Sequence, residues 1–147
     1  MVIVILGMVA AMAMPRYAGF MATRQLEAAA RRIAADLALA REQARLTSAA
    51  KTVTFDALAN CYTLTGVSDP DRAGASYEVC MGEEPYRATL VTPDFGGDAE
   101  IIFDGYGVPD SGGSVVIRVG SLQETVSLEA GTGRAQALGV GDTSATE

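Results

Sequence analysis

The chain has 147 residues, contains no histidine and carries a formal net charge of −7. Without histidine, the Ser-His-Asp triad, Cys-His nucleophiles and most zinc sites are excluded, so we expect no enzyme, no metal and no cofactor. The charge divides unevenly. Residues 1–51 hold seven basic and three acidic residues, whereas residues 52–147 hold four basic and fifteen acidic ones. The second segment is strongly acidic, which disfavours nucleic-acid binding by neutralisation of phosphates.

The chain opens with an apolar run, MVIVILGMVAAMAM, at residues 1–14. Three interpretations are open: the apolar region of a secretory signal, a buried core helix, or a membrane helix whose first residues precede this sequence. No basic residues come before the run, and Pro15-Arg16-Tyr17 follows it instead of a small-residue cleavage site. A signal peptide is therefore disfavoured. The run is shorter than the ~20 residues that span a bilayer as a helix.

The next segment, residues 18–50, is rich in good helix formers and contains no proline. Apolar residues recur in it at alternating spacings of three and four, which predicts one stripe along a helix. The members of this stripe are Leu26, Ala30, Ile33, Leu37, Ala40 and Ala44. We therefore predict a helix over residues 1–50, with 1–14 embedded in a membrane and 15–50 amphipathic. A kink or local melting is expected at Pro15, which cannot donate a backbone hydrogen bond.

After residue 51 the pattern changes to short runs typical of strands, separated by turn residues. We predict a β-rich domain over residues 51–138 and a flexible tail over residues 139–147. The predicted strands cover residues 53–55, 61–64, 76–80, 87–91, 99–103, 114–119, 124–128 and 134–138.

Three stretches of this sequence resemble one protein superfamily. The apolar run closed by Pro-Arg-Tyr resembles the N-terminal helix of type IV pilins and type II secretion pseudopilins. Residues 33–44 resemble the Leu-x-x-Asp-Leu-x-x-Ala-Arg-x-x-Ala pattern of the GspH/FimT branch of minor pseudopilins, with Ile33 in the first position. Gly131-Thr132-Gly133-Arg134 resembles the Gly-x-Gly-Arg near the end of that branch.

The resemblance implies an α+β fold, in which a long N-terminal pilin-type helix packs on an antiparallel β-sheet domain. It implies a structural minor subunit of a periplasmic type II secretion pseudopilus or type IV pilus, held in the bacterial inner membrane by a single pass before assembly. The implied partners are other pilin or pseudopilin subunits, the inner-membrane assembly platform and, if a leader precedes this sequence, prepilin peptidase. The implied assembly and membrane helix includes Val2, Ile3, Val4, Ile5, Leu6, Gly7, Met8, Val9 and Pro15.

Family members also carry a basic leader, a glycine at the processing site and an acidic residue just before the apolar run. None of these is present here. Counting back from Pro15, we expect about seven mature residues to precede Met1, which would bring the apolar helix to about 21 residues, enough to span a bilayer.

The two cysteines, Cys61 and Cys80, are spaced too far apart for a C-x-x-C motif. A disulfide is chemically permitted in a periplasmic domain. It would link the first hairpin to the next strand. The alternative is a pair of buried thiols that act as small apolar residues.

Further candidate ligand residues lie in loops. Asp69, Asp71, Asp94 and Asp98 have a chemistry that suits Ca²⁺, but their spacing matches no EF-hand, and solvated loop acids are the favoured interpretation. Arg134 is a weak nucleic-acid candidate, because DNA-binding minor pilins of the FimT kind carry Gly-Arg-x-Arg at this place. Here the second arginine is replaced by Gln136. A FimT-like DNA receptor is therefore the alternative function, and nucleic-acid binding is disfavoured.

Overall fold

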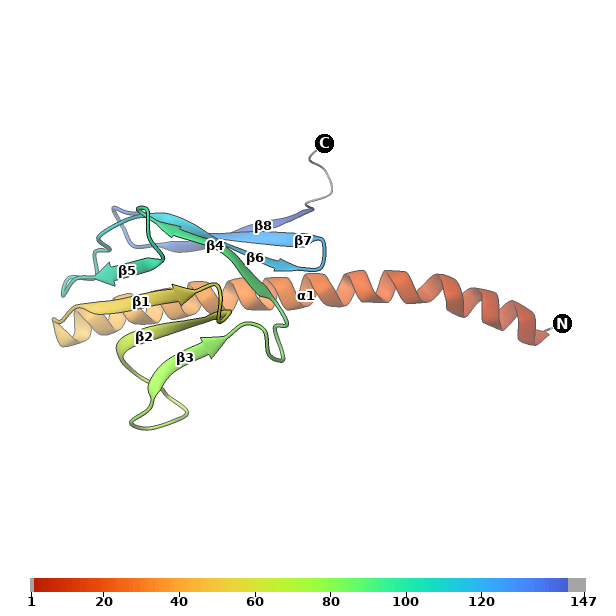
Figure 1. Cartoon of the computed structure of the whole chain (residues 1–147), viewed down its shortest axis with the longest axis horizontal. Helices are drawn as coiled ribbons and strands as arrows, with labels where there is room; N and C mark the ends of the chain where they lie inside the picture. Colours follow the sequence, from red (N-terminus) through yellow and green to blue (C-terminus); the bar gives the residue numbers. More distant parts are fainter. Residues whose placement is uncertain (1, 143–147) are drawn as a thin grey trace.

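The structure is a computed structural model that describes the backbone of residues 2–142 and the side chains of residues 17–141. The described part contains one helix, α1 (Val2–Thr47), followed by eight strands. Figure 1 shows α1 lying along the strands with its C-terminal half and projecting beyond them with its N-terminal half. The predicted class, a long helix packed on antiparallel strands, is confirmed.

The strands form two four-stranded antiparallel sheets. The first sheet has the order β3-β2-β1-β5, and the second has the order β4-β6-β7-β8. The strand bounds in the first sheet are β1 (Lys51–Asp56), β2 (Cys61–Ser68), β3 (Ser76–Cys80) and β5 (Glu100–Phe103). Those in the second are β4 (Thr89–Phe95), β6 (Gly113–Val119), β7 (Leu122–Leu128) and β8 (Ala135–Asp142). Each predicted strand overlaps one of these.

The core lies between α1 and the two sheets. All six members of the predicted helix stripe are buried, with at most 1% of any of them exposed. The helix contacts β6, β7 and β8 of the second sheet and β1, β2 and β5 of the first. Phe55 of β1 stacks on Phe95 of β4 with ring centroids 5.4 Å apart, so aromatic packing joins the two sheets directly.

The helix ends at Thr47 in a C-terminal capping motif that contains no glycine. Ser48 adopts a left-handed conformation with φ of 48°. Ala49 N donates to Ala44 O at 3.2 Å and Ser48 N to Arg45 O at 3.4 Å, which is the Schellman arrangement. At the other end the helix continues through Pro15, so the local melting expected there is not found. One proline removes one backbone hydrogen bond and leaves those on either side intact.

The prediction of a flexible tail was wrong for residues 139–142. β8 continues to Asp142, and Leu122, Gln123 and Glu124 of β7 pair with residues 140–142. A register shift between Glu124 and Val126 and a left-handed Gly139, with φ of 96°, allow the strand to continue past a composition typical of a loop. The rest of the predicted tail, residues 143–147, lies outside the described residues.

Candidate assembly surface

A buried carboxylate fixes the position of α1 on the first sheet. Asp36, in the middle of the helix, is 4% exposed. Its Oδ2 accepts a hydrogen bond from the Tyr62 hydroxyl at 2.5 Å and its Oδ1 accepts one from the Tyr77 hydroxyl at 2.7 Å. Arg32 Nε donates to Oδ2 at 2.9 Å, and Arg32 Nη2 donates to the Tyr77 oxygen at 2.6 Å. One helix residue is thereby tied to both β2 and β3.

The electrostatics of this cluster keep its donors protonated. Burial raises the pKa of Tyr62, and the charge of Asp36 raises it further. Burial, followed by the hydrogen bond to Asp36, raises the pKa of Tyr77 to about 12. Burial alone would lower the pKa of Arg32, but its hydrogen bond and attraction to Asp36 outweigh this and raise it. Both hydroxyls and the guanidinium therefore remain donors to one buried anion.

A second buried acid, Glu124, lies between α1 and β8. Its side chain is 5% exposed, and Oε2 has no hydrogen-bond partner. Burial raises the pKa of Glu124, and the charge of Glu27 on α1 adds to the rise. A hydrogen bond from the backbone N–H of Gly139 and the charge of Arg31 act in the opposite direction. Unlike Asp36, this carboxyl has incomplete partners and a like charge nearby.

Two glycines allow loops to approach the C-terminal part of the helix. Gly107, with φ of 78°, follows β5, and a Cβ there would lie 2.6 Å from Arg45 Cγ. Gly133, with φ of 65°, precedes β8, and a Cβ there would lie 3.1 Å from Pro109 Cδ and 3.3 Å from Arg41 Cδ. The Gly-x-Gly-Arg segment thus packs against α1 through its second glycine, while Arg134 itself is exposed.

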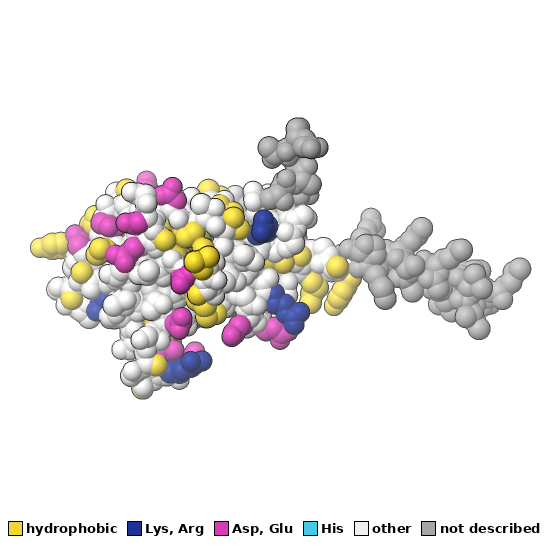
Figure 2. All heavy atoms as spheres, viewed as in Figure 1, with side chains coloured by type: hydrophobic (Ala, Val, Ile, Leu, Met, Phe, Trp, Pro, Cys, Tyr) yellow, Lys and Arg dark blue, Asp and Glu magenta, His cyan; other side chains and the backbone are white. Residues whose placement is uncertain are grey.

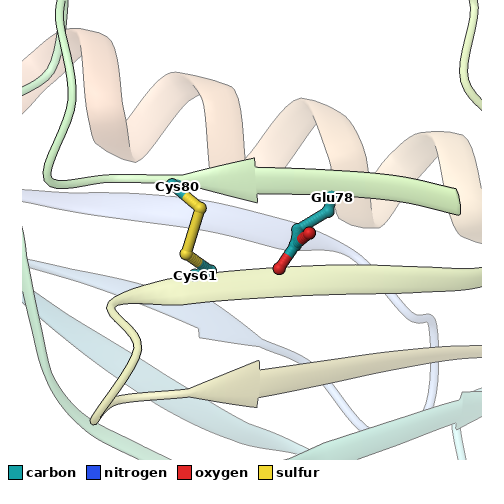
Figure 3. Close-up of side chains that lie close together, drawn as sticks. All are labelled: Cys61, Glu78 and Cys80. Atoms are coloured by element: carbon teal, nitrogen blue, oxygen red, sulfur yellow. A yellow bond between two sulfur atoms is a disulfide. The ribbon is translucent and has the colours of Figure 1, made fainter. Parts of the chain in front are cut away.

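The two cysteines are directly opposite each other on β2 and β3, and their sulfur atoms form a disulfide of 2.11 Å. Figure 3 shows this bond with Glu78 beside it. The three side chains are a group whose potential ligand atoms lie within 4.8 Å of one another. The sulfurs are bonded to each other and are not thiolates, so the group offers a metal only one carboxylate.

The loop acids act locally. Asp69 Oδ1 accepts from Asp71 N at 2.8 Å, Asp94 Oδ1 accepts from Gly97 N at 3.0 Å, and Asp98 Oδ1 accepts from Glu100 N at 3.0 Å. Each of these three carboxylates shapes its own turn. In residues 17–141, the group around the disulfide is the one cluster with the spacing of a metal site, and none of the four aspartates belongs to it.

The first residues of α1 with described side chains are not covered by the sheets. Tyr17, Phe20 and Met21 are 69%, 55% and 45% exposed, whereas Leu26 is fully buried. Hydrophobic side chains gather where the helix leaves the domain (Figure 2). The helical residues with described side chains include no stretch long and apolar enough to cross a membrane. Of the predicted membrane helix, the side chains at 2–9 and Pro15 fall outside the described residues.

The sequence profile described as Type II transport protein GspH matches residues 29–136, which is most of the chain. The chain belongs to the GspH family. Its fold is similar to that of the type IV minor pilin FimU of Pseudomonas aeruginosa, with a TM-score of 0.54, 18% identity, and coverage of 80% of this chain and 90% of FimU. No curated protein matches it in sequence.

Family membership confirms the resemblance inferred from the sequence. GspH proteins are structural pseudopilins without enzymatic activity, and membership implies a place in the cell envelope and interaction with other pilins of the secretion machinery. The matched residues of this GspH chain include Asp36, Tyr62, Tyr77 and Glu124, whereas Tyr17 and Phe20 precede the match.

The polar cluster of this GspH protein was missed by sequence reasoning. Arg32 and Asp36 are four positions apart, a spacing equally typical of a solvated surface ion pair, and nothing in the sequence connects them to Tyr62 or Tyr77.

The burial of Glu124 could have been predicted from the sequence. Glu124, Val126 and Leu128 occupy every second position of the strand, and the latter two are apolar and buried, so period-two spacing places Glu124 on the same inward face.

Proposed function

We propose that this protein is a structural minor subunit of a periplasmic fibre, either a type II secretion pseudopilus or a type IV pilus, and that it joins the fibre through the N-terminal half of α1. One observation supports this most directly. The helix has 46 residues, yet the first buried one among its described side chains, which begin at residue 17, is Leu26. The preceding half projects beyond both sheets (Figure 1). A helix with such a sequence is stabilised when lipid or other helices cover it.

Before assembly, the apolar run at residues 1–14 holds the protein in the inner membrane by a single pass, with the β-rich domain in the periplasm. Extraction into a helical bundle then exchanges lipid for neighbouring subunits. Gly7, Ala10, Ala11 and Ala13 are small enough to permit close approach of helices. The inner-membrane assembly platform would act on this helix, as would prepilin peptidase where a leader precedes it.

The proposal is tested by placing a charge in the apolar run of the chromosomal gene. Val9→Asp should remove the protein from both the membrane and the sheared fibre fraction, because a carboxylate near the centre of an apolar helix is costly in lipid. The matched control is Leu58→Asp in the β1–β2 turn, where the side chain is 101% exposed. This variant should fractionate as the wild type does. If Val9→Asp reached the fibre as well as the wild type, the apolar helix would not be the assembly element.

A further inference from the structure

The exposed aromatic residues of α1 form one surface together with an arginine. Tyr17, Phe20 and Arg24 follow one another at spacings of three and four residues, so they share one face of the helix. The guanidinium carbon of Arg24 lies 4.9 Å from the centroid of the Phe20 ring, a cation–π contact. Met21 lies beside them and is 45% exposed. We call Tyr17, Phe20, Met21 and Arg24 the collar.

The collar is not an extension of the core. Leu26 follows Tyr17 by nine positions, which is about two and a half turns at 3.6 residues per turn, so the two point to opposite sides of the helix. The sheets cover the side that carries Leu26, Ala30 and Ile33, all fully buried. Tyr17, Phe20 and Met21 remain 69%, 55% and 45% exposed, so a large part of their apolar area is available to a partner from outside the described residues.

The position and chemistry of the collar indicate that partner. It lies just after the apolar run and just before Leu26, which is the first fully buried residue among the described side chains of the helix. Tyrosine and arginine concentrate where a membrane helix meets water, because each has an apolar body and a polar or charged end. The collar has one of each, Tyr17 and Arg24, and the apolar ring of Phe20 lies under the Arg24 guanidinium. Residues 1–26 contain two basic residues, Arg16 and Arg24, and no acidic one, whereas residues 52–147 have a net charge of −11. An anionic surface would attract the collar and repel the domain beyond it.

We propose that the collar is a docking surface for the headgroup layer of anionic phospholipids. It sets the depth of α1 in the membrane and holds the acidic domain away from the bilayer surface. This inference rests on the proposed membrane residence of the helix and adds the lipid class that the protein selects.

The chain contains no tryptophan, so a single Trp reports the surroundings of one chosen position. Phe20→Trp places the reporter in the collar, and the matched control Tyr106→Trp places it in the loop after β5, where the side chain is 86% exposed. Both full-length variants are reconstituted into vesicles of phosphatidylcholine with or without phosphatidylglycerol. Brominated lipids, labelled either near the headgroup or deep in the acyl chain, serve as quenchers.

The expected result is a blue-shifted emission of Phe20→Trp that shallow bromine quenches more than deep bromine, with stronger quenching when phosphatidylglycerol is present. Tyr106→Trp should remain unshifted and unquenched. The effect of phosphatidylglycerol should be lost when Arg24→Gln is added to Phe20→Trp, and kept when Arg118→Gln, an exposed arginine on β6, is added instead.

Three results would overturn the inference in different ways. If the protein bound vesicles but the emission of Phe20→Trp stayed unshifted, the collar would not be a lipid-docking surface, and the proposed membrane residence would still stand. A blue shift that grows with protein concentration in detergent without vesicles would assign the collar to a second copy of the chain. Failure of every variant to sediment with vesicles would refute the proposed membrane residence itself.

Discussion

The hydroxyl group of Tyr62 on β2 lies 2.5 Å from Oδ2 of Asp36 on α1 and donates to it inside the core. The same carboxylate receives Tyr77 and Arg32, so a charge that would be costly alone is compensated by three donors. This contact fixes both the rotation of the helix about its axis and its register along the first sheet.

Removal of the Asp36 charge should destabilise the fold strongly. Asp36→Ala removes the acceptor of both tyrosine hydroxyls and of Arg32 Nε, and we expect a loss of about 3 kcal/mol in the free energy of unfolding. The control is Glu42→Gln on the exposed face of the same helix, where the ion pair with Arg45 spans 3.9 Å and should matter by less than about 0.5 kcal/mol. Thermal unfolding of the full-length variants in detergent measures both. If Asp36→Ala were as stable as the wild type, the Asp36 cluster would contribute nothing to the free energy of unfolding.

Glu124 should make stability depend on pH in the direction opposite to a salt-bridged acid. Its pKa is raised in the folded protein, so the folded state binds the proton more tightly than the unfolded state does. The resulting stabilisation is fully present below the unfolded pKa and is lost as the pH rises through the folded pKa.

Glu124→Gln removes this titration. At neutral pH the variant should be more stable than the wild type by about 1 kcal/mol, because no charge remains beside the unpartnered position. Its melting temperature should also fall less between pH 5 and pH 8. Glu83→Gln, in an exposed loop, should retain the wild-type pH profile. A Glu124→Gln profile parallel to the wild type would contradict the assignment.

Oxidation of Cys61 and Cys80 should be needed for full stability. The bridge closes a loop with a sequence separation of 19, and the loop-entropy model gives about 3 kcal/mol for such a bridge. We expect protein from the periplasm to resist thiol labelling in denaturant until a reductant is added, and its melting temperature to fall after reduction. Labelling of both cysteines without reductant would show that they are separate thiols in the cell.

Gly107 should tolerate a side chain less well than other left-handed glycines. Gly107→Ala introduces both an unfavourable φ and a contact with Arg45, and together these should cost about 3 kcal/mol. Gly120→Ala, with φ of 62° and no atom within 4 Å of the added Cβ, separates the two effects and should cost about 1 kcal/mol. If Gly107→Ala and Gly120→Ala lost similar free energies of unfolding in urea, the loop that carries Gly107 would not lie close to the helix.

DNA should bind weakly if at all. Arg134 is exposed, but it is one of four basic residues among fifteen acidic ones in residues 52–147. We expect no retardation of duplex DNA in a gel at physiological salt and no change with Arg134→Ala. Retardation that weakens with salt and disappears in Arg134→Ala would instead support a DNA receptor.

The sequence predicted those parts of the fold that depend on periodicity. Leu26 and Ala44 could be assigned to a buried stripe because the apolar spacing of three and four extends between them. The polar interior could not be predicted, because Asp36 acquires its partners only when strands far along the chain reach the helix. The end of β8 was missed for a similar reason. Gly139 is typical of a loop in isolation, and pairing with β7 decides that the strand continues.

The short connection between α1 and β1 has a mechanical consequence. The helix ends at Thr47 and β1 begins at Lys51, and the strand returns along the helix in the opposite direction (Figure 1). A force applied to the N-terminal end of α1 along its axis therefore loads the whole buried stripe in shear, together with the Asp36 hydrogen bonds. Contacts loaded in parallel must break together, whereas contacts that are peeled break one at a time. The domain is thus built to follow its helix when the helix is pulled.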